Sequence, residues 1–171
     1  MKGYIQVYTG NGKGKTTAAL GLALRASGAG LKVYFAQFIK GMDYSELYSV
    51  KRLSDNITLK QYGRECFIYK EPDEEDFKVA RNGFSEVTKI IAEGKYDIVV
   101  LDEINIAIYY KLISVEEVLE LLDNKPENVE LVLTGRNVDK KIIERADLVT
   151  EMKEIKHYYQ KGIHARKGIE S

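Results

Sequence analysis

Residues 4–19 read YIQVYTGNGKGKTTAA, in which a short aromatic and β-branched run leads into a glycine-rich segment and then an alanine-rich one. A strand, a glycine-rich turn and a helix that opens with Lys-Thr-Thr form the arrangement that a phosphate-binding loop requires. Gly10, Gly12 and Gly14 allow successive backbone N–H groups to turn inward, and the N-terminus of the following helix adds further groups that attract anions. We therefore predict that this stretch binds the phosphates of a nucleotide.

Within this loop, Lys15 is expected to bring a positive charge to the phosphate oxygens, and the Thr16 hydroxyl to bind Mg²⁺. The stretch departs in one place from the pattern G-x-x-x-x-G-K-[ST], because Thr9 stands where the first glycine belongs and Gly10 follows it. The alternative is a glycine-rich turn that binds nothing. The predicted nucleotide-binding residues of the loop are Gly10, Asn11, Gly12, Lys13, Gly14, Lys15, Thr16 and Thr17.

The rest of the chain alternates short apolar runs with helical patterns. The runs predict buried strands over residues 4–8, 32–38, 57–61, 97–101, 129–134 and 148–151. The helical patterns are an alanine- and leucine-rich segment over 16–27, an apolar stripe over 77–91 and a capping box at Ser114 and Glu117. The acidic run EPDEED at 71–76 is expected to cap the long helix. We predict an α/β fold, a three-layer P-loop NTPase domain of RecA-like type with a mostly parallel sheet, and a single domain over residues 1–171.

Composition narrows the class of protein further. The 171 residues carry 26 lysines and arginines against 26 aspartates and glutamates, which argues against a dedicated nucleic-acid binder. The single cysteine, Cys66, excludes a disulfide within the chain and suits a reducing cytosol. Because no apolar run has the length that crosses a bilayer, we expect a soluble, cytoplasmic protein without membrane association.

A second half of the nucleotide site is predicted at the end of the fourth apolar run. Residues 97–103 read DIVVLDE, so that Asp102 and Glu103 follow a buried strand. An aspartate in this position can hold Mg²⁺ directly or through water, and the following glutamate can bind the metal or act as a base. The predicted metal-binding residues are therefore Thr16, Asp102 and Glu103.

The residues alone leave the reaction open, because phosphate loops serve kinases, ATPases and GTPases alike. The chain lacks the Asn-Lys-x-Asp motif with which GTPases read guanine, and His157 and His164 lie in a lysine-rich stretch that predicts a surface. One alternative is a P-loop ATPase or small-molecule kinase that cleaves the γ-phosphate, with Glu103 as the base. Another is a binding module that senses the nucleotide without turning it over.

Six stretches, taken together, resemble one known family. They are residues 10–30, 37–41 (QFIKG), 99–104 (VVLDEI), 133–137 (LTGRN), 146–152 (ADLVTEM) and 155–170. In this order and spacing they are similar to the ATP:corrinoid adenosyltransferases of the P-loop type. The resemblance implies transfer of the 5′-deoxyadenosyl group of ATP to the Co(I) of a reduced corrinoid, with release of intact triphosphate. The bond broken would then be C5′–O and not P–O.

The resemblance also implies roles for individual residues. Lys15, Glu103, Arg25 and Arg136 are implied as catalytic, with both arginines near the phosphates, and Lys40 of QFIKG is expected in the same crevice. Phe67 and Tyr69 match the aromatic residues that press on the corrinoid, with Tyr69 in place of a tryptophan. The implied partners are ATP, the corrinoid, a reductase that donates electrons and a second copy of the chain in a homodimer.

Overall fold

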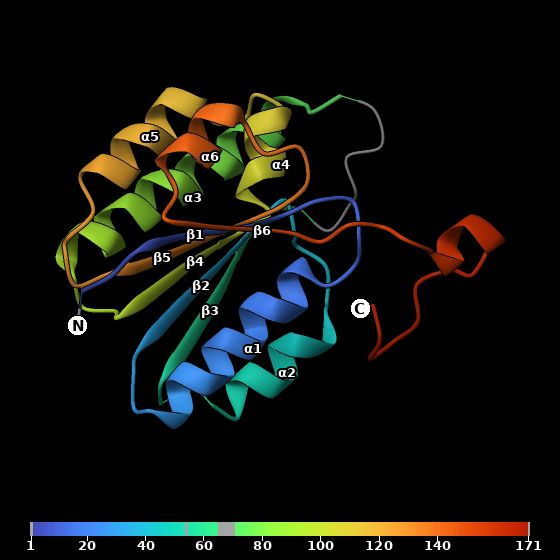
Figure 1. Cartoon of the computed structure of the whole chain (residues 1–171), viewed down its shortest axis with the longest axis horizontal. Coiled ribbons are helices and arrows are strands. Elements are labelled where there is room, and N and C mark those ends of the chain that lie inside the picture. The colour runs from blue at the N-terminus through green and yellow to red at the C-terminus, as the bar shows by residue number, and fades with distance from the viewer. Residues whose placement is uncertain (1, 54, 65–70, 171) are drawn as a thin grey trace.

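Parallel strands form the centre of the computed structural model, which describes residues 2–53, 55–64 and 71–170 (Figure 1). Within these ranges, six strands pair in the order β3-β2-β4-β5-β1-β6, and every pairing is parallel. The predicted α/β class is confirmed. The strands are β1 (Ile5–Thr9), β2 (Val33–Phe38), β3 (Ile57–Tyr62), β4 (Ile98–Asp102), β5 (Glu130–Thr134) and β6 (Leu148–Glu151).

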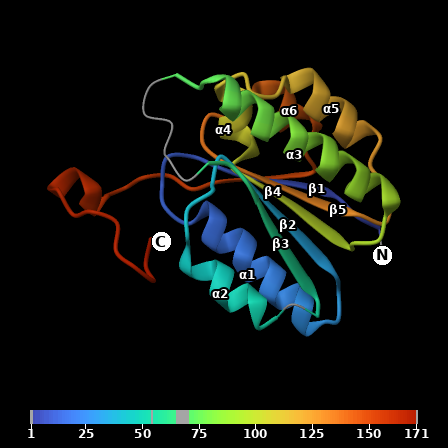
Figure 2. The same cartoon turned by 180° about the vertical axis from the view of Figure 1, so that it is seen from behind.

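Helices cover both faces of this sheet, as Figures 1 and 2 show from opposite sides. One face carries α1 (Lys15–Gly28) and α2 (Ser45–Lys51). The other carries α3 (Glu74–Glu93), α4 (Ile104–Tyr109), α5 (Val115–Asp123) and α6 (Lys140–Arg145). The apolar side chains accordingly form two clusters, one beneath each layer of helices. Because β2, β4 and β5 are covered on both sides, they are buried along their whole length, as their continuous apolar sequences require.

Local sequence accounts for the longer helices. The α3 helix begins at a capping box in which the Asp73 side chain accepts backbone N–H groups, so the predicted capping role of the acidic run is confirmed. Its predicted stripe is buried from Ala80 onward, whereas Phe77 in the first turn is 38% exposed. The capping box at Ser114 is also confirmed, as the start of α5.

The carboxyl ends of all these strands meet at one edge of the sheet because the strands are parallel. β1 leads there into Gly10, β2 into Lys40, β4 into Glu103 and β5 into Arg136. The crevice outside the carboxyl ends is where open α/β sheets bind their ligands. The topology therefore brings four separate predicted segments to a common place.

The segment after β6 passes along the same edge and then leaves the body of the molecule, ending in a 3₁₀ helix, η1 (Tyr158–Lys161), and a short tail (Figures 1 and 2). Met152 exchanges backbone hydrogen bonds with the loop, because its N–H donates to Thr9 O and its carbonyl accepts from Gly12 N. In the part of the chain that the structure describes, none of the helices combines the length and apolar character needed to span a bilayer.

Candidate active site

The phosphate loop runs from the end of β1 to the first residue of α1, as the sequence predicts. Gly10 and Gly14 have positive φ angles of 97° and 118°, a region that residues with a Cβ rarely enter. Gly12 is required for a different reason, since a Cβ there would lie 2.6 Å from the carbonyl oxygen of Met152. Its N–H donates to that same oxygen at 2.7 Å, so this amide faces the segment after β6 and does not turn into the cradle.

Lys15 closes the loop from within. Its side chain is buried, and its Nζ donates to Gly10 O at 2.8 Å and to Gly12 O at 2.7 Å. Burial lowers the pKa of the Lys15 ammonium, and the neighbouring Glu103 carboxylate opposes that shift. The three N–H donors at the end of this long side chain can exchange the carbonyl oxygens for phosphate oxygens.

Asp102, the last residue of β4, is the centre of the site. Its side chain is fully buried and accepts four hydrogen bonds. Oδ1 accepts from Thr16 Oγ1 at 2.9 Å and from Thr134 Oγ1 at 2.7 Å. Oδ2 accepts from Lys40 Nζ at 2.8 Å and from Gln37 Nε2 at 3.4 Å. We call these five residues the Asp102 cluster; it joins the phosphate loop to three different strands.

Lys40 reaches Asp102 from the turn that follows β2. The preceding residue, Ile39, has a φ angle of 63°, which is an outlier for a β-branched side chain and marks a strained turn. Burial alone would lower the pKa of the Lys40 ammonium, but the ion pair with Asp102 outweighs this effect and the pKa is raised. Lys40 Nζ also donates to Thr16 Oγ1 at 3.1 Å.

Glu103 lies one residue beyond Asp102, in a left-handed conformation with a φ angle of 60°, at the start of α4. Its N–H donates to Thr134 Oγ1 at 3.0 Å, so that a single hydroxyl binds both acidic positions. Burial raises the pKa of the Glu103 carboxyl, and the negative charge of Asp102 raises it further. The positive charges of Lys40, Lys15 and Arg136 act in the opposite direction, which places all three within electrostatic reach of this carboxylate.

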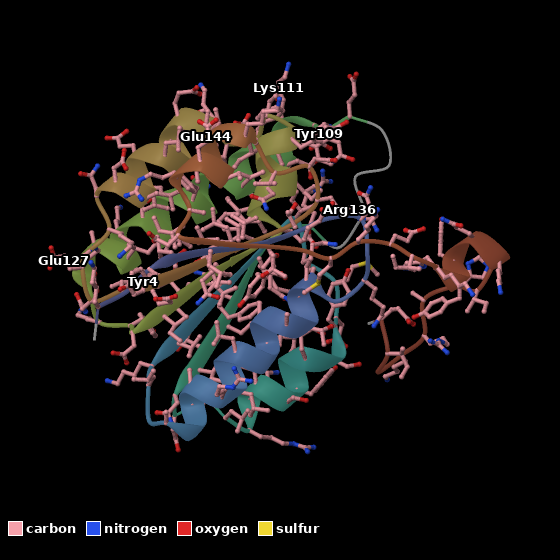
Figure 3. The ribbon with its side chains drawn as sticks, in the orientation of Figure 1. Tyr4, Tyr109, Lys111, Glu127, Arg136 and Glu144 are labelled. Atoms are coloured by element: carbon pink, nitrogen blue, oxygen red, sulfur yellow. The ribbon has the colours of Figure 1, made fainter. Side chains whose placement is uncertain are left out.

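Arg136 follows β5 on a turn built by Gly135, whose φ angle is 129°. Figure 3 shows Arg136 at the same end of the sheet as the phosphate loop. Asn105, buried in the first turn of α4, supports the turn by donating from Nδ2 to Gly135 O at 3.2 Å. The positive charge of Arg136 adds to the lowering of the Lys15 pKa.

Three of the predicted nucleotide-binding residues are exposed to solvent. Asn11, Lys13 and Thr17 are exposed, and Lys13 Nζ donates to the carbonyl oxygen of Ile169 in the C-terminal tail at 3.1 Å. Exposure leaves their side chains open to a ligand. For these three residues, nucleotide binding therefore stays a prediction.

The structure places Arg25 far from Lys15 along the same helix. It lies exposed in the last turn of α1, ten residues after Lys15, which is about 15 Å along the helix axis. Its positive charge partly offsets the rise that burial produces in the pKa of Tyr8 on β1. The helix geometry thus separates two residues that the resemblance placed together. The predicted corrinoid residues Phe67 and Tyr69 lie outside the described residues.

Two members of the Asp102 cluster were not singled out by the sequence, namely Gln37 and Thr134. Gln37 is the last but one residue of β2 and pairs with Asp102 of β4, whereas Thr134 is the last residue of β5 and pairs with Tyr8 of β1. Both fall inside motifs quoted above, QFIKG and LTGRN, and a polar residue at the end of an otherwise apolar strand is the signal that could have identified them.

The oxygen donors of the site suit a hard cation. Thr16 Oγ1 and Asp102 lie within hydrogen-bond distance, and a positive group, the Lys40 ammonium, already binds to both. Within the described ranges no group of three or more His, Cys, Asp or Glu residues could hold a metal by itself. A Mg²⁺ ion here would therefore take further oxygen ligands from water or a bound triphosphate.

Comparisons with known proteins agree over the whole chain. A family model described as ATP:corrinoid adenosyltransferase BtuR/CobO/CobP matches residues 1–171. A corrinoid adenosyltransferase of Sinorhizobium sp is 39% identical over 172 residues, which is 99% of this chain and 80% of that protein. The corrinoid adenosyltransferase of Pseudomonas aeruginosa is 36% identical over 171 residues, covering 99% and 84%. That of Escherichia coli (strain K12) is 34% identical over 176 residues, covering 99% and 86%.

Proposed function

Because this chain belongs to the ATP:corrinoid adenosyltransferase family, we propose that its phosphate loop and Asp102 cluster bind the triphosphate of ATP and direct C5′ toward a reduced corrinoid. The activity follows from the family and the full-length relatives: the chain is a corrinoid adenosyltransferase. In this reaction the electron pair of Co(I) attacks C5′, a Co–C bond forms and the C5′–O bond breaks. The electron pair of that bond leaves with the triphosphate.

The observation that carries the proposed arrangement is the way Lys15 is held. Its ammonium lies inside the loop on two carbonyl oxygens, Gly10 O and Gly12 O, within hydrogen-bond distance of both. We propose that it exchanges these oxygens for phosphate oxygens when ATP binds. Positive groups fixed around a departing triphosphate stabilise the charge that develops on it. We expect this stabilisation of the leaving group to be a main source of the catalysis.

Arg136 and Glu103 complete the proposed phosphate side of the site. Arg136 would approach the triphosphate from the turn after β5, the strand next to β1, which leads into the loop with Lys15. A cobalt nucleophile carries no proton, so the reaction requires no general base. We therefore assign Glu103 a role as a metal ligand and electrostatic neighbour, in keeping with its position among three positive side chains.

The remaining assignments are proposals of the same kind. Thr16 and Asp102 are proposed to hold Mg²⁺ together with Glu103, and the ion would neutralise charge on the triphosphate. Phe67 and Tyr69 are proposed to contact the corrinoid. A reductase that supplies the electron for Co(I) and a second copy of the chain as dimer partner are proposed from the family resemblance, and a cytoplasmic location is proposed from the single cysteine.

The test is an anaerobic assay in the dark with MgATP and chemically reduced cobalamin. We expect the visible spectrum of a photolabile alkyl-cobalt product and the release of intact triphosphate. Release of ADP or orthophosphate with an unchanged corrinoid spectrum would contradict the proposal and indicate cleavage at the γ-phosphate.

A pair of lysine variants tests the assignment of Lys15. Lys15→Met should lose at least about 100-fold in rate, since a charge that stabilises the leaving group has gone. Lys125→Met is the matched control, because Lys125 is also partly buried and donates to two carbonyl oxygens, Gly3 O and Pro126 O. It lies at the opposite end of the sheet, next to residues that precede β1 and β5. Equal losses in both variants would refute a specific role for Lys15.

A further inference from the structure

Lys40 makes a pair of contacts that its predicted place in the nucleotide crevice does not explain. Its Nζ lies 2.8 Å from Asp102 Oδ2 and 3.1 Å from Thr16 Oγ1. The side chain is only 16% exposed, and Asp102 is fully buried. The ammonium is therefore held between Thr16 and Asp102, which are also residues of the proposed metal site.

The direction of the hydrogen bonds shows which oxygen lone pairs the Lys40 ammonium occupies. Thr16 has one hydroxyl proton, which it donates to Asp102 Oδ1 at 2.9 Å. The N–H of Lys40 therefore meets a lone pair of Thr16 Oγ1, and a second N–H meets a lone pair of Asp102 Oδ2. A divalent cation that used these two oxygens would need the same lone pairs, directly or through a bound water molecule.

We propose that the Lys40 ammonium is a built-in substitute for the divalent metal, so that a metal ion binds between Thr16 and Asp102 only after this lysine has moved away. The proposal rests on the metal site of the proposed function and adds an order of events to it. The ammonium and the ion exclude each other twice, by occupying the same oxygens and by like-charge repulsion at a distance of a few ångströms.

The surroundings of Lys40 fit a side chain that changes partners. Lysine has a flexible four-carbon stem, and its compact charge binds without the fixed geometry that arginine imposes. The turn that carries it is strained at Ile39, and strained backbone of this kind is characteristic of switch regions. An incoming triphosphate offers negative charge to Lys40, while the metal that accompanies it takes over the compensation of the buried Asp102 charge.

Binding of Mn²⁺ to the protein in the absence of nucleotide tests this directly. Electron paramagnetic resonance measures the unbound ion, and neither ATP nor corrinoid is needed. We expect weak binding to the wild-type protein and at least ~10-fold tighter binding to Lys40→Met, since a competing positive charge within about 4 Å has been removed. Lys40→Arg keeps the charge and is expected to bind Mn²⁺ as weakly as the wild type.

The double variant Lys40→Met/Asp102→Asn locates the ion. It removes the carboxylate, so the gain in Mn²⁺ affinity should disappear. The proposal is overturned if Lys40→Met binds Mn²⁺ no more tightly than the wild type, or if the gain persists in the double variant. Should Lys40→Met fail to fold, Lys40→Gln provides the same comparison, because its amide can donate to Asp102 without a charge.

These outcomes are separable from those of the proposed function. If the wild-type protein is an active transferase but Lys40→Met shows no gain in Mn²⁺ affinity, only the proposal that Lys40 substitutes for the metal is refuted. The gain in Mn²⁺ affinity in a protein that releases ADP would refute only the adenosyl transfer.

Discussion

Replacing Thr134 by valine should destabilise the protein. Thr134 is fully buried, and its hydroxyl serves both acidic residues at once: it donates to Asp102 Oδ1 at 2.7 Å and accepts from the Glu103 N–H at 3.0 Å. Valine has nearly the same shape but lacks the hydroxyl. Thr134→Val therefore removes both bonds without creating a cavity.

The magnitude follows from the two bonds. A hydrogen bond to an ionised carboxylate contributes roughly 1.5–3 kcal/mol and one between neutral groups roughly 0.5–1.5 kcal/mol. The added methyl group returns about 0.8 kcal/mol through burial. We expect the free energy of unfolding to fall by about 2–3 kcal/mol, which corresponds to a decrease in Tm of roughly 5–10 °C for a chain of this length.

Denaturant unfolding followed by circular dichroism measures this loss, with Thr134→Ser as the matched control. Serine keeps the hydroxyl and removes only a buried methyl group, so Thr134→Ser should cost about 1 kcal/mol. If Thr134→Val is no less stable than Thr134→Ser, the hydroxyl does not hold the site together and the reasoning fails.

Three further changes test other parts of the molecule. Because burial raises the pKa of Glu103 in the folded state, its ionisation destabilises the fold as pH rises from the ordinary glutamate pKa of 4.5 through the raised pKa. Glu103→Gln should therefore be more stable than the wild type at neutral pH and show no advantage below about pH 4 in thermal unfolding; an unchanged difference across this range would contradict the assigned burial. Asp73→Ala removes the N-cap of α3 and should cost about 1 kcal/mol in denaturant unfolding, while Asp73→Asn should retain most of the stability. Arg136→Ala should lower kcat/KM for ATP at least about 10-fold in the transfer assay, with a smaller loss for Arg25→Ala; the reverse order would refute the placement of these arginines.

Much of the fold could be predicted from local sequence. Each of the six predicted strands is present, with boundaries that differ by at most one residue at either end. Helices α1, α3 and α5 are predictable from the sequence, either because they are long enough to show a helical pattern of apolar residues or because a capping box marks their start. The short helices α2, α4 and α6, of seven, six and six residues, were not predicted. Segments of this length form too few turns to show a period, and packing against the sheet decides their conformation.

The candidate site was only partly predictable, for a related reason. The phosphate loop is a continuous segment, so the spacing of Gly10, Gly12, Gly14 and Lys15 already contains its chemistry. Asp102 was recognisable because it ends an apolar run. The approach of Lys40 and Thr134 to that carboxylate depends on which strands are neighbours and how they are registered, and no local pattern contains this information.

The sequence by itself determined the alternation of strand and helix, the phosphate loop and, through its resemblance to a family, the reaction. Only the tertiary structure decided that the Lys40 ammonium binds Thr16 and Asp102, and that the Gly12 N–H donates to the Met152 carbonyl. The physical reason is the range of the forces that act. Backbone conformation and helix capping depend on residues a few positions apart, whereas the partners of a buried charge are chosen by the sheet that brings distant segments together.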